Sequence, residues 1–161
     1  MKKLIASHTQ NIYLKPGEIV VSSEPVLVST VLGSCVAVTF FSPVSGVGAI
    51  CHAMLPDNPG RSEDLRYVDS AVRHIFRKVM EYGAGSDLEV KLFGGAQVLD
   101  VGDSESSRRT VGELNVASAL EILDALGLTV AGADTGGVVG RRLYFCTRDG
   151  DVYLRRMRHK K

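Results

Sequence analysis

The chain has 161 residues, of which 45% are hydrophobic and 23% are charged, and its formal net charge is +1. A chain of this length is expected to form a single domain, residues 1–161, whose core needs neither disulfides nor a metal. The small net charge gives no indication of a nucleic-acid partner, and no apolar run is long enough to predict membrane insertion.

The cysteines and the two ends of the chain add expectations about compartment and partners. The apolar stretch at residues 4–6 is too short for a signal peptide, so the protein is predicted to be cytoplasmic, with reduced thiols. The three cysteines include no CxxC pair, which argues against both a disulfide framework and a structural zinc site. The basic residues after position 154 are interpreted as a solvated tail rather than a phosphate- or membrane-binding patch.

The first half of the chain has the pattern of strands followed by a helix. Strands are expected at residues 18–21, 26–30, 35–41 and 47–55. A helix is expected over residues 67–82, where apolar side chains as far as Met80 recur at three- and four-residue spacing. Gly83 follows this segment as a stop signal.

The second half has a strand, a second helix and three further strands. The strands are expected at residues 88–93, 128–133, 142–147 and 152–156, and Asp149-Gly150 predicts a hairpin between the last two. The helix is expected over residues 112–126, after a Thr110–Glu113 capping box, with Leu120 in its apolar stripe. Both helical stripes are predicted to face the core. The fold class is therefore α+β, with packed, mostly antiparallel β-sheets and helices on the outside.

The hairpin predicted from residues 35–55 carries the residues best suited to chemistry. If Ser42 pairs with Ser45 across the turn, Cys35 lies directly opposite His52, with Cβ atoms about 4.5–5.5 Å apart. A slip of two residues would make Cys35 and His52 diagonal neighbours on the same face. A bulge or a one-residue slip would separate them.

A thiol beside an imidazole is the arrangement that nucleophilic catalysis needs. The imidazole of His52 can take the proton of Cys35, and backbone N–H groups of the Gly33-Ser34 turn could hold an oxyanion. The hydroxyl of Ser29 or that of Thr30 is predicted to orient the imidazole; the carboxylate of Asp57 is a less favoured alternative. A lone buried cysteine is more often a small hydrophobe, and this interpretation is preferred for Cys51 and Cys146.

The sequence resembles the CheD family of chemoreceptor glutamine deamidases. The resemblance is carried by LGSCVAV at residues 32–38 and HAMLP at 52–56, then YVDSA at 67–71 and KLFGGA at 91–96. Further on, it is carried by Gly112 with Asn115, by DTGG at residues 134–137 and by Gly140-Arg141. These blocks keep the family's order over about residues 15–156. Leu114 departs from the pattern, since arginine is expected there.

The resemblance implies a catalytic cysteine and histidine at Cys35 and His52. It implies a threonine hydroxyl as third residue, although ungapped counting arrives at Ser29, with Thr30 next to it. It also implies a fold related to cysteine-dependent bacterial toxin deamidases.

The function implied by the resemblance is deamidation of glutamines in methyl-accepting chemotaxis receptors to glutamate, with no metal or organic cofactor. The alternative is a regulatory module that binds a CheC-type phosphatase, with little or no catalysis. A thiol redox protein is a weaker hypothesis, because no resolving cysteine stands at CxxC spacing. The segments Gly94-Gly95 and DTGG are predicted either to shape a substrate groove or to form tight turns.

Overall fold

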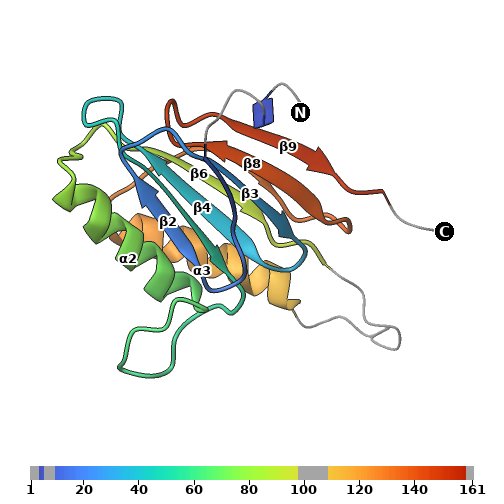
Figure 1. Cartoon of the computed structure of the whole chain (residues 1–161). Helices are drawn as coiled ribbons and strands as arrows, with labels where there is room; N and C mark the ends of the chain where they lie inside the picture. The colour runs from blue at the N-terminus through green and yellow to red at the C-terminus, as the bar shows by residue number, and fades with distance from the viewer. Residues whose placement is uncertain (1–3, 6–9, 98–108, 159–161) are drawn as a thin grey trace.

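The computed structural model describes residues 4–5, 10–97 and 109–158. Two β-sheets are packed face to face, and helices α2 and α3 cover the outer face of one of them (Figure 1). The four-stranded sheet has the order β1-β3-β8-β9 and the five-stranded sheet the order β2-β5-β4-β6-β7. The elements are β1 Asn11–Tyr13, β2 Ile19–Ser22, β3 Leu27–Leu32, β4 Val36–Phe41, β5 Gly48–Ala53, α2 Val68–Glu81, β6 Glu89–Gly94, α3 Val111–Ala125, β7 Val130–Thr135, β8 Arg141–Cys146 and β9 Val152–Arg156.

This arrangement confirms the α+β class and all eight predicted strands, whose ends shift by at most two residues. Strand β1 was not predicted, because three residues are too few to show alternation. Two strand pairs are parallel, β1 with β3 and β6 with β7, and the other pairs are antiparallel. The sheets are therefore mostly antiparallel, as expected.

The central strands β4 and β5 are buried along their whole length. Alternate side chains of β4 pack into two different cores. Val38 and Phe40 belong to the core beneath the helices, whereas Ala37 belongs to the core between the two sheets. On β5, Cys51 belongs to the helix-side core and Ile50 to the core between the sheets. This alternation follows from the two-residue period of a strand.

Both predicted helices are confirmed, with a difference in the faces they bury. The hydroxyl of Thr110 accepts a hydrogen bond from the Glu113 amide at 3.2 Å, as the capping box predicts. Met80 and Leu120, which were expected to face the core, are 42% and 48% exposed. The sheet-facing side of α3 instead includes the polar residues Asn115 and Ser118, which are buried, and this orientation leaves Leu120 on the outside.

The predicted register of the β4–β5 hairpin is wrong by two residues. Ala37, not Cys35, lies opposite His52. The turn is longer than expected, because Ser42 pairs with Val47 through a 2.9 Å backbone hydrogen bond. Gly46, with a φ of 78°, provides the left-handed residue that completes this longer turn.

No helix in the described part of the chain is long and apolar enough to cross a membrane.

Candidate active site

Cys35 lies in the short turn between β3 and β4, and its residue is half-buried. The carbonyls of three successive residues in this turn each accept a hydrogen bond from a residue in or next to β6 or α3. The Ala96 amide donates to the Gly33 carbonyl at 3.0 Å, and the Gly95 amide donates to the Cys35 carbonyl at 2.9 Å. The Asn115 side-chain amide donates to the Ser34 carbonyl at 2.9 Å. Within the described residues, the N–H groups of Gly33 and Ser34 make no hydrogen bond.

Gly94 at the end of β6 and Gly95 directly after it allow this close approach of backbone to backbone. Gly94 has a φ of 104°, and a Cβ atom added there would lie 2.3 Å from the Cys35 carbonyl oxygen. Any side chain at this position would push the turn away from β6. Gly94-Gly95 therefore forms the contact that fixes the cysteine turn.

His52 lies on β5 and is 2% exposed, on the face directed toward the four-stranded sheet. Its Nδ1 atom is 2.7 Å from the Oγ1 atom of Thr30, which lies on β3 in that other sheet. The Thr30 hydroxyl donates to the Leu14 carbonyl at 2.8 Å. Since a carbonyl only accepts and a hydroxyl has one proton, Nδ1 of His52 must be the donor to Thr30. The lone pair then lies on Nε2, which has no hydrogen-bond partner among the described residues.

Cys35 and His52 are diagonal neighbours across the β4–β5 ladder. The strand register places Ala37 opposite His52, so Cys35 stands two residues before the opposite position, which keeps it on the same face. Cys35 packs against the core between the sheets, the same core that contains Ala37. Diagonal neighbours have Cα atoms about 7–8 Å apart, and a long side chain such as histidine can span that separation.

Burial sets the charge state of both groups. It raises the pKa of the Cys35 thiol, an effect that the residue's own backbone N–H partly opposes. It lowers the pKa of His52 to about 4, against the opposing effect of the Leu14 carbonyl. Near pH 7 the resting pair is therefore a neutral thiol and a neutral imidazole with a free Nε2 lone pair.

The two candidate hydroxyls lie on opposite sides of β3. Thr30 is fully buried beside His52, whereas Ser29 is on the opposite face of the strand and pairs in register with Tyr144. Asp57 accepts a 2.5 Å hydrogen bond from Ser118 on α3. Of the three candidates for orienting His52, only Thr30 contacts the imidazole in the described structure.

The other two cysteines are core residues. Cys51 is fully buried, and burial raises its pKa to about 12. Cys146 is 2% exposed, and burial raises its pKa to about 11. Their burial confirms that both belong to the core, and the raised pKa values keep both thiols protonated near neutral pH.

Asn115 is a buried residue that sequence reasoning noted only as part of the family resemblance. Its side-chain amide donates to the carbonyls of Ser34, at 2.9 Å, and Met54, at 3.2 Å. One side chain thus joins the turn that holds Cys35 to the segment that follows β5. The signal in the sequence is a polar residue within the core-facing side of a predicted helix.

The DTGG segment connects the two sheets at the end of the molecule where the Cys35 turn lies. Asp134 accepts from Arg141 at 2.8 Å and from Arg156 at 2.7 Å, so it links β7 of one sheet to β8 and β9 of the other. The Gly136 amide donates to the Gly94 carbonyl at 3.0 Å. Asp134 and Thr135 are the last residues of β7, so the turn interpretation holds only for Gly136 and Gly137, which follow the strand.

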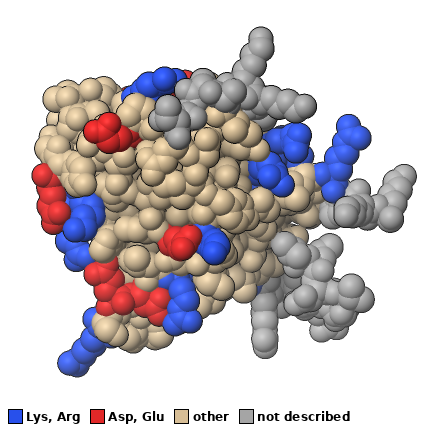
Figure 2. Space-filling view, in the orientation of Figure 1, with Lys and Arg blue, Asp and Glu red and all other residues tan. Residues whose placement is uncertain are grey.

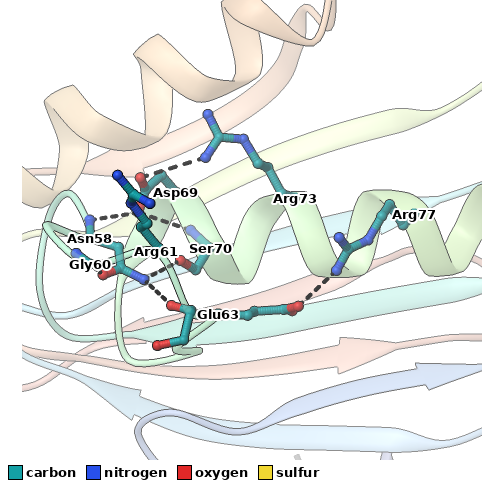
Figure 3. Close-up of a pocket in the computed structure, with 9 residues that line it drawn as sticks. Asn58, Gly60, Arg61, Glu63, Asp69, Ser70, Arg73 and Arg77 are labelled. Carbon is teal, nitrogen blue, oxygen red and sulfur yellow. Dashed lines mark hydrogen bonds and ion pairs between the residues drawn. The ribbon is translucent and has the colours of Figure 1, made fainter.

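A hollow of about 300 Å³ lies elsewhere, between α2 and the loop that follows β5 (Figure 3). Two ion pairs lie along it: Arg77 with Glu63 at 2.9 Å, and Arg73 with Asp69 at 3.7 Å. Its lining residues are Asn58, Gly60, Arg61, Ser62, Glu63, Asp69, Ser70, Arg73 and Arg77. None of the predicted site residues is among them, so the chemistry is not assigned to this hollow.

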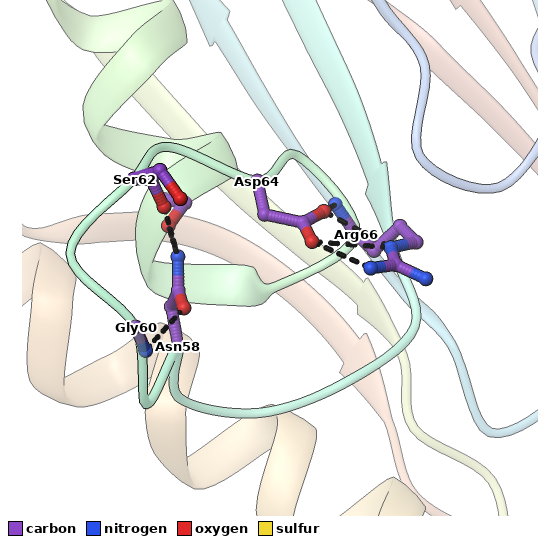
Figure 4. Close-up of polar contacts among 6 residues, drawn as sticks. Asn58, Gly60, Ser62, Asp64 and Arg66 are labelled. Carbon is purple, nitrogen blue, oxygen red and sulfur yellow. Dashed lines mark hydrogen bonds and ion pairs between the residues drawn. The ribbon is translucent and has the colours of Figure 1, made fainter.

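The loop beside this hollow is fixed by its own polar contacts (Figure 4). The Asn58 side chain donates to the Ser62 carbonyl at 2.9 Å and accepts from the Gly60 amide at 2.8 Å. Arg66 pairs with Asp64 at 2.7 Å, and the Arg66 carbonyl accepts the Met54 amide at 2.8 Å. The loop therefore holds the end of β5, two residues beyond His52.

Comparisons with known proteins identify the family of the chain. A family described as CheD chemotactic sensory transduction matches residues 54–156. A protein of Geobacter sulfurreducens named probable chemoreceptor glutamine deamidase CheD 2 is 47% identical over 148 residues, 91% of this chain and 90% of the relative. Probable chemoreceptor glutamine deamidases CheD of Maridesulfovibrio salexigens and Pseudomonas syringae pv. tomato are 42% and 36% identical. They cover 94% and 89% of this chain, and 94% and 88% of their own lengths.

The protein is thus a β-sandwich with helices on one side, and its candidate site consists of a half-buried cysteine, Cys35, and a buried histidine, His52, at the core between the two sheets. The chain belongs to the CheD family.

Proposed function

We propose that the protein deamidates glutamine side chains of methyl-accepting chemotaxis receptors, with Cys35 as nucleophile and His52 as general base and acid. The observation that carries this proposal is the orientation of His52. Its Nδ1 is held by Thr30, and its Nε2 lone pair has no other hydrogen-bond partner among the described residues. The relatives named chemoreceptor glutamine deamidase supply the substrate class.

The proposed reaction begins from the neutral pair. Nε2 of His52 takes the thiol proton as the sulfur of Cys35 attacks the side-chain carbonyl carbon of the glutamine. The oxyanion that forms is held by the N–H groups of Gly33 and Ser34, which make no hydrogen bond within the described residues. His52 returns the proton to the departing nitrogen, which leaves as ammonia and leaves a thioester on Cys35.

Hydrolysis of the thioester completes the cycle. A water molecule gives one proton to Nε2 of His52 and adds to the thioester carbon. Collapse of this second tetrahedral intermediate breaks the C–S bond, and the sulfur of Cys35 recovers the proton from His52. The products are glutamate and free enzyme, and the scheme uses no metal or organic cofactor.

The test is mass spectrometry of a purified receptor cytoplasmic fragment after incubation with the protein. Wild-type protein should convert specific glutamines to glutamate, whereas Cys35→Ala and His52→Ala should not. Cys146→Ala, which removes a core thiol, is the matched control and should remain active. An active Cys35→Ala protein would contradict the mechanism.

The same assay separates catalysis from the alternative role, a binding module for a CheC-type phosphatase. If no receptor fragment changes mass with wild-type protein, the binding role replaces the enzymatic one. A pull-down of the phosphatase with wild type and with Cys35→Ala would then show whether docking needs the thiol.

A further inference from the structure

Arg141 is a buried cation at one end of the core between the two sheets. It is 2% exposed, and it alternates along β8 with Leu143 and Phe145, which belong to that core. Figure 2 shows Lys and Arg side chains that stand out from the surface of the molecule. Four other described arginines form ion pairs with side chains that are 58–64% exposed: Arg66, Arg73, Arg77 and Arg156. Because burial of a charge costs free energy, the fold keeps Arg141 in place at some expense of stability.

The side chain of Arg141 reaches from the four-stranded sheet to the end of β7 in the other sheet. Its Nε atom donates to Asp134 at 2.8 Å, and its Nη2 atom donates to the Gly136 carbonyl at 2.9 Å. Gly136 follows β7 directly and has a φ of 79°, a left-handed conformation that turns the chain out of the strand. Arg141 therefore holds the chain at the point where β7 ends.

Residues 94–97, at and after the end of β6, connect this point to the Cys35 turn. Two of their amides donate to carbonyls of the Cys35 turn, and the other two residues bond to residues 136–137. The four hydrogen bonds, of 2.8–3.0 Å, join the Gly95 amide to Cys35, the Ala96 amide to Gly33, the Gly136 amide to Gly94 and the Gln97 amide to Gly137. A displacement of residues 136–137 would therefore be passed to the Cys35 turn through backbone hydrogen bonds.

The backbone of Arg141 holds the Cys35 turn from its other end. Arg141 is the first residue of β8 and pairs with Leu32, the last residue of β3, directly before the turn. The Cys35 turn, residues 94–97, residues 136–137 and Arg141 thus form a closed ring of contacts. The side chain of Arg141 is the link that closes this ring.

The unpaired buried polar atoms of the described residues also lie around the Cys35 turn. They are Nε2 of His52, Oδ1 of Asn115 and Nη1 of Arg141. His52 is the diagonal neighbour of Cys35, and Asn115 donates to the Ser34 carbonyl. Buried polar atoms without partners are rare, and such departures from full pairing are expected at functional sites. Arg141 therefore has this property in common with two residues of the candidate site.

We infer that Arg141 is a positioning residue that keeps the Cys35 turn in the shape needed to hold the oxyanion. The inference rests on the proposed function, in which the N–H groups of Gly33 and Ser34 hold that oxyanion. Arg141 acts through its neighbours: it fixes the segment after β7, which fixes the segment after β6, which fixes the turn. Lysine is not equivalent here, because an ammonium group is a point charge, whereas a planar guanidinium donates to two acceptors in fixed directions.

Arg141→Lys tests the inference with the buried charge retained. The variant should lower kcat for deamidation of a receptor fragment about 10²-fold and leave KM within about twofold, because a displaced oxyanion turn weakens transition-state binding. Lys91→Met is the matched control. Lys91 also joins the two sheets, since its Nζ atom donates to the Gly150 carbonyl at 3.0 Å, but it does so at the opposite end of β8. This control should keep kcat within about twofold, and equal kcat values for the two variants would overturn the inference.

Alkylation of Cys35 by iodoacetamide separates the turn from the cysteine–histidine pair. In this reaction the sulfur displaces iodide from a saturated carbon and its proton passes to a base, so no oxyanion forms. Arg141→Lys should therefore be alkylated at Cys35 within about threefold of the wild-type rate, as followed by site-resolved mass spectrometry, although its deamidation is about 10²-fold slower. A parallel loss in both reactions would overturn the inference, because Arg141 would then act on the thiol and its base.

A second variant carries the test if Arg141→Lys does not fold. Asp134→Asn keeps the guanidinium but removes the charge that holds its Nε atom, and it should lower kcat about tenfold with Cys35 alkylation near the wild-type rate. An unchanged kcat in this variant would overturn the inference. Absence of turnover by wild-type protein would instead overturn the proposed function.

Discussion

His52 owes its charge and its tautomer to one hydroxyl group and to burial. Thr30 donates its proton to the Leu14 carbonyl and so accepts from Nδ1 of His52. Burial then keeps the ring neutral well below pH 7. Under the proposed mechanism, a base prepared in this way would take the thiol proton when substrate arrives, and no thiolate–imidazolium pair would form beforehand.

Thr30→Val tests the role of this hydroxyl with little change in shape. The variant removes the acceptor for Nδ1, so His52 is no longer held in the productive tautomer, and we expect the deamidation rate to fall about 10²-fold. Ser29→Ala, at the adjacent position on the other face of β3, should retain activity within about twofold when the rates of both variants are measured by ammonia release. Equal losses in the two variants would show that the hydroxyl of Thr30 has no special role.

The lowered pKa of His52 predicts a loss of stability in acid. Below pH 6.5 the unfolded chain protonates this histidine, whereas the folded chain does not until about pH 4. The unfolded state therefore binds more protons in this window, and the free energy of unfolding should fall by about 2 kcal/mol between pH 7 and pH 5 from this group. Urea denaturation of wild type and His52→Gln at both pH values measures the effect. If the variant shows the same pH dependence as wild type, the group responsible is not His52.

At the scale of secondary structure, the geometry of the site depends on helix α3. Strands β4 and β5 bring Cys35 and His52 to one face, but only diagonally. Asn115 on α3 joins the Cys35 turn to the segment after β5 through the Ser34 and Met54 carbonyls. Because both neighbours are carbonyls, the nitrogen of the side-chain amide must face them, so the orientation of Asn115 is fixed.

Asn115→Ala tests whether Asn115 positions the Cys35 turn for catalysis or only stabilises the fold. Loss of the two hydrogen bonds should lower kcat about 10²-fold, because small displacements of reacting groups are costly, while KM changes little. Ser118→Ala is the matched control one turn further along α3, since it removes a buried hydrogen bond to Asp57. Both variants should lose about 1–3 kcal/mol of stability in chemical denaturation, and only Asn115→Ala should lose activity. A similar loss of kcat in both would make Asn115 an ordinary structural residue.

At the scale of the whole molecule, the two sheets are joined by charge as well as by apolar packing. Arg141 is almost fully buried, and its charge is balanced by Asp134 from the other sheet, which also pairs with Arg156. Removal of a carboxylate that balances a buried cation leaves that cation unpaired in the core.

Asp134→Asn should therefore lower the free energy of unfolding by about 3 kcal/mol, because the Arg141 charge would remain buried without its partner. Glu63→Gln breaks the exposed ion pair with Arg77 and should cost less than about 1 kcal/mol. Thermal or urea unfolding of the two variants measures the difference. Similar costs would mean that water reaches Arg141 and screens it.

The residue pattern predicted both described helices and every described strand except β1, and it predicted that Cys51 and His52 point to opposite faces of β5. The strand period alone places Cys51 and His52 on opposite faces, and the structure agrees. The exact register was not predictable, because the number of residues in the Ser42–Val47 turn depends on a left-handed Gly46.

The contacts of the site were harder to predict than its strands. Ungapped counting favoured Ser29 over Thr30, although only Thr30 points to the space between the sheets. Asn115 contacts the Cys35 turn through Ser34, which is 81 positions earlier in the chain. No local sequence pattern encodes a contact over that separation.

The hydrogen bond between His52 and Thr30 crosses from one sheet to the other, so in a newly made chain it can form only after both sheets have folded. Strand β3 is held in its sheet by β8, which is synthesised more than a hundred residues after β3 begins. While the ribosome still holds the β8–β9 hairpin, Cys35 and His52 can already share a face of the five-stranded sheet, but the imidazole lacks the group that orients it. Under the proposed mechanism, a truncated or half-folded chain would carry the thiol without an effective base, so only chains whose synthesis and folding are complete would be active.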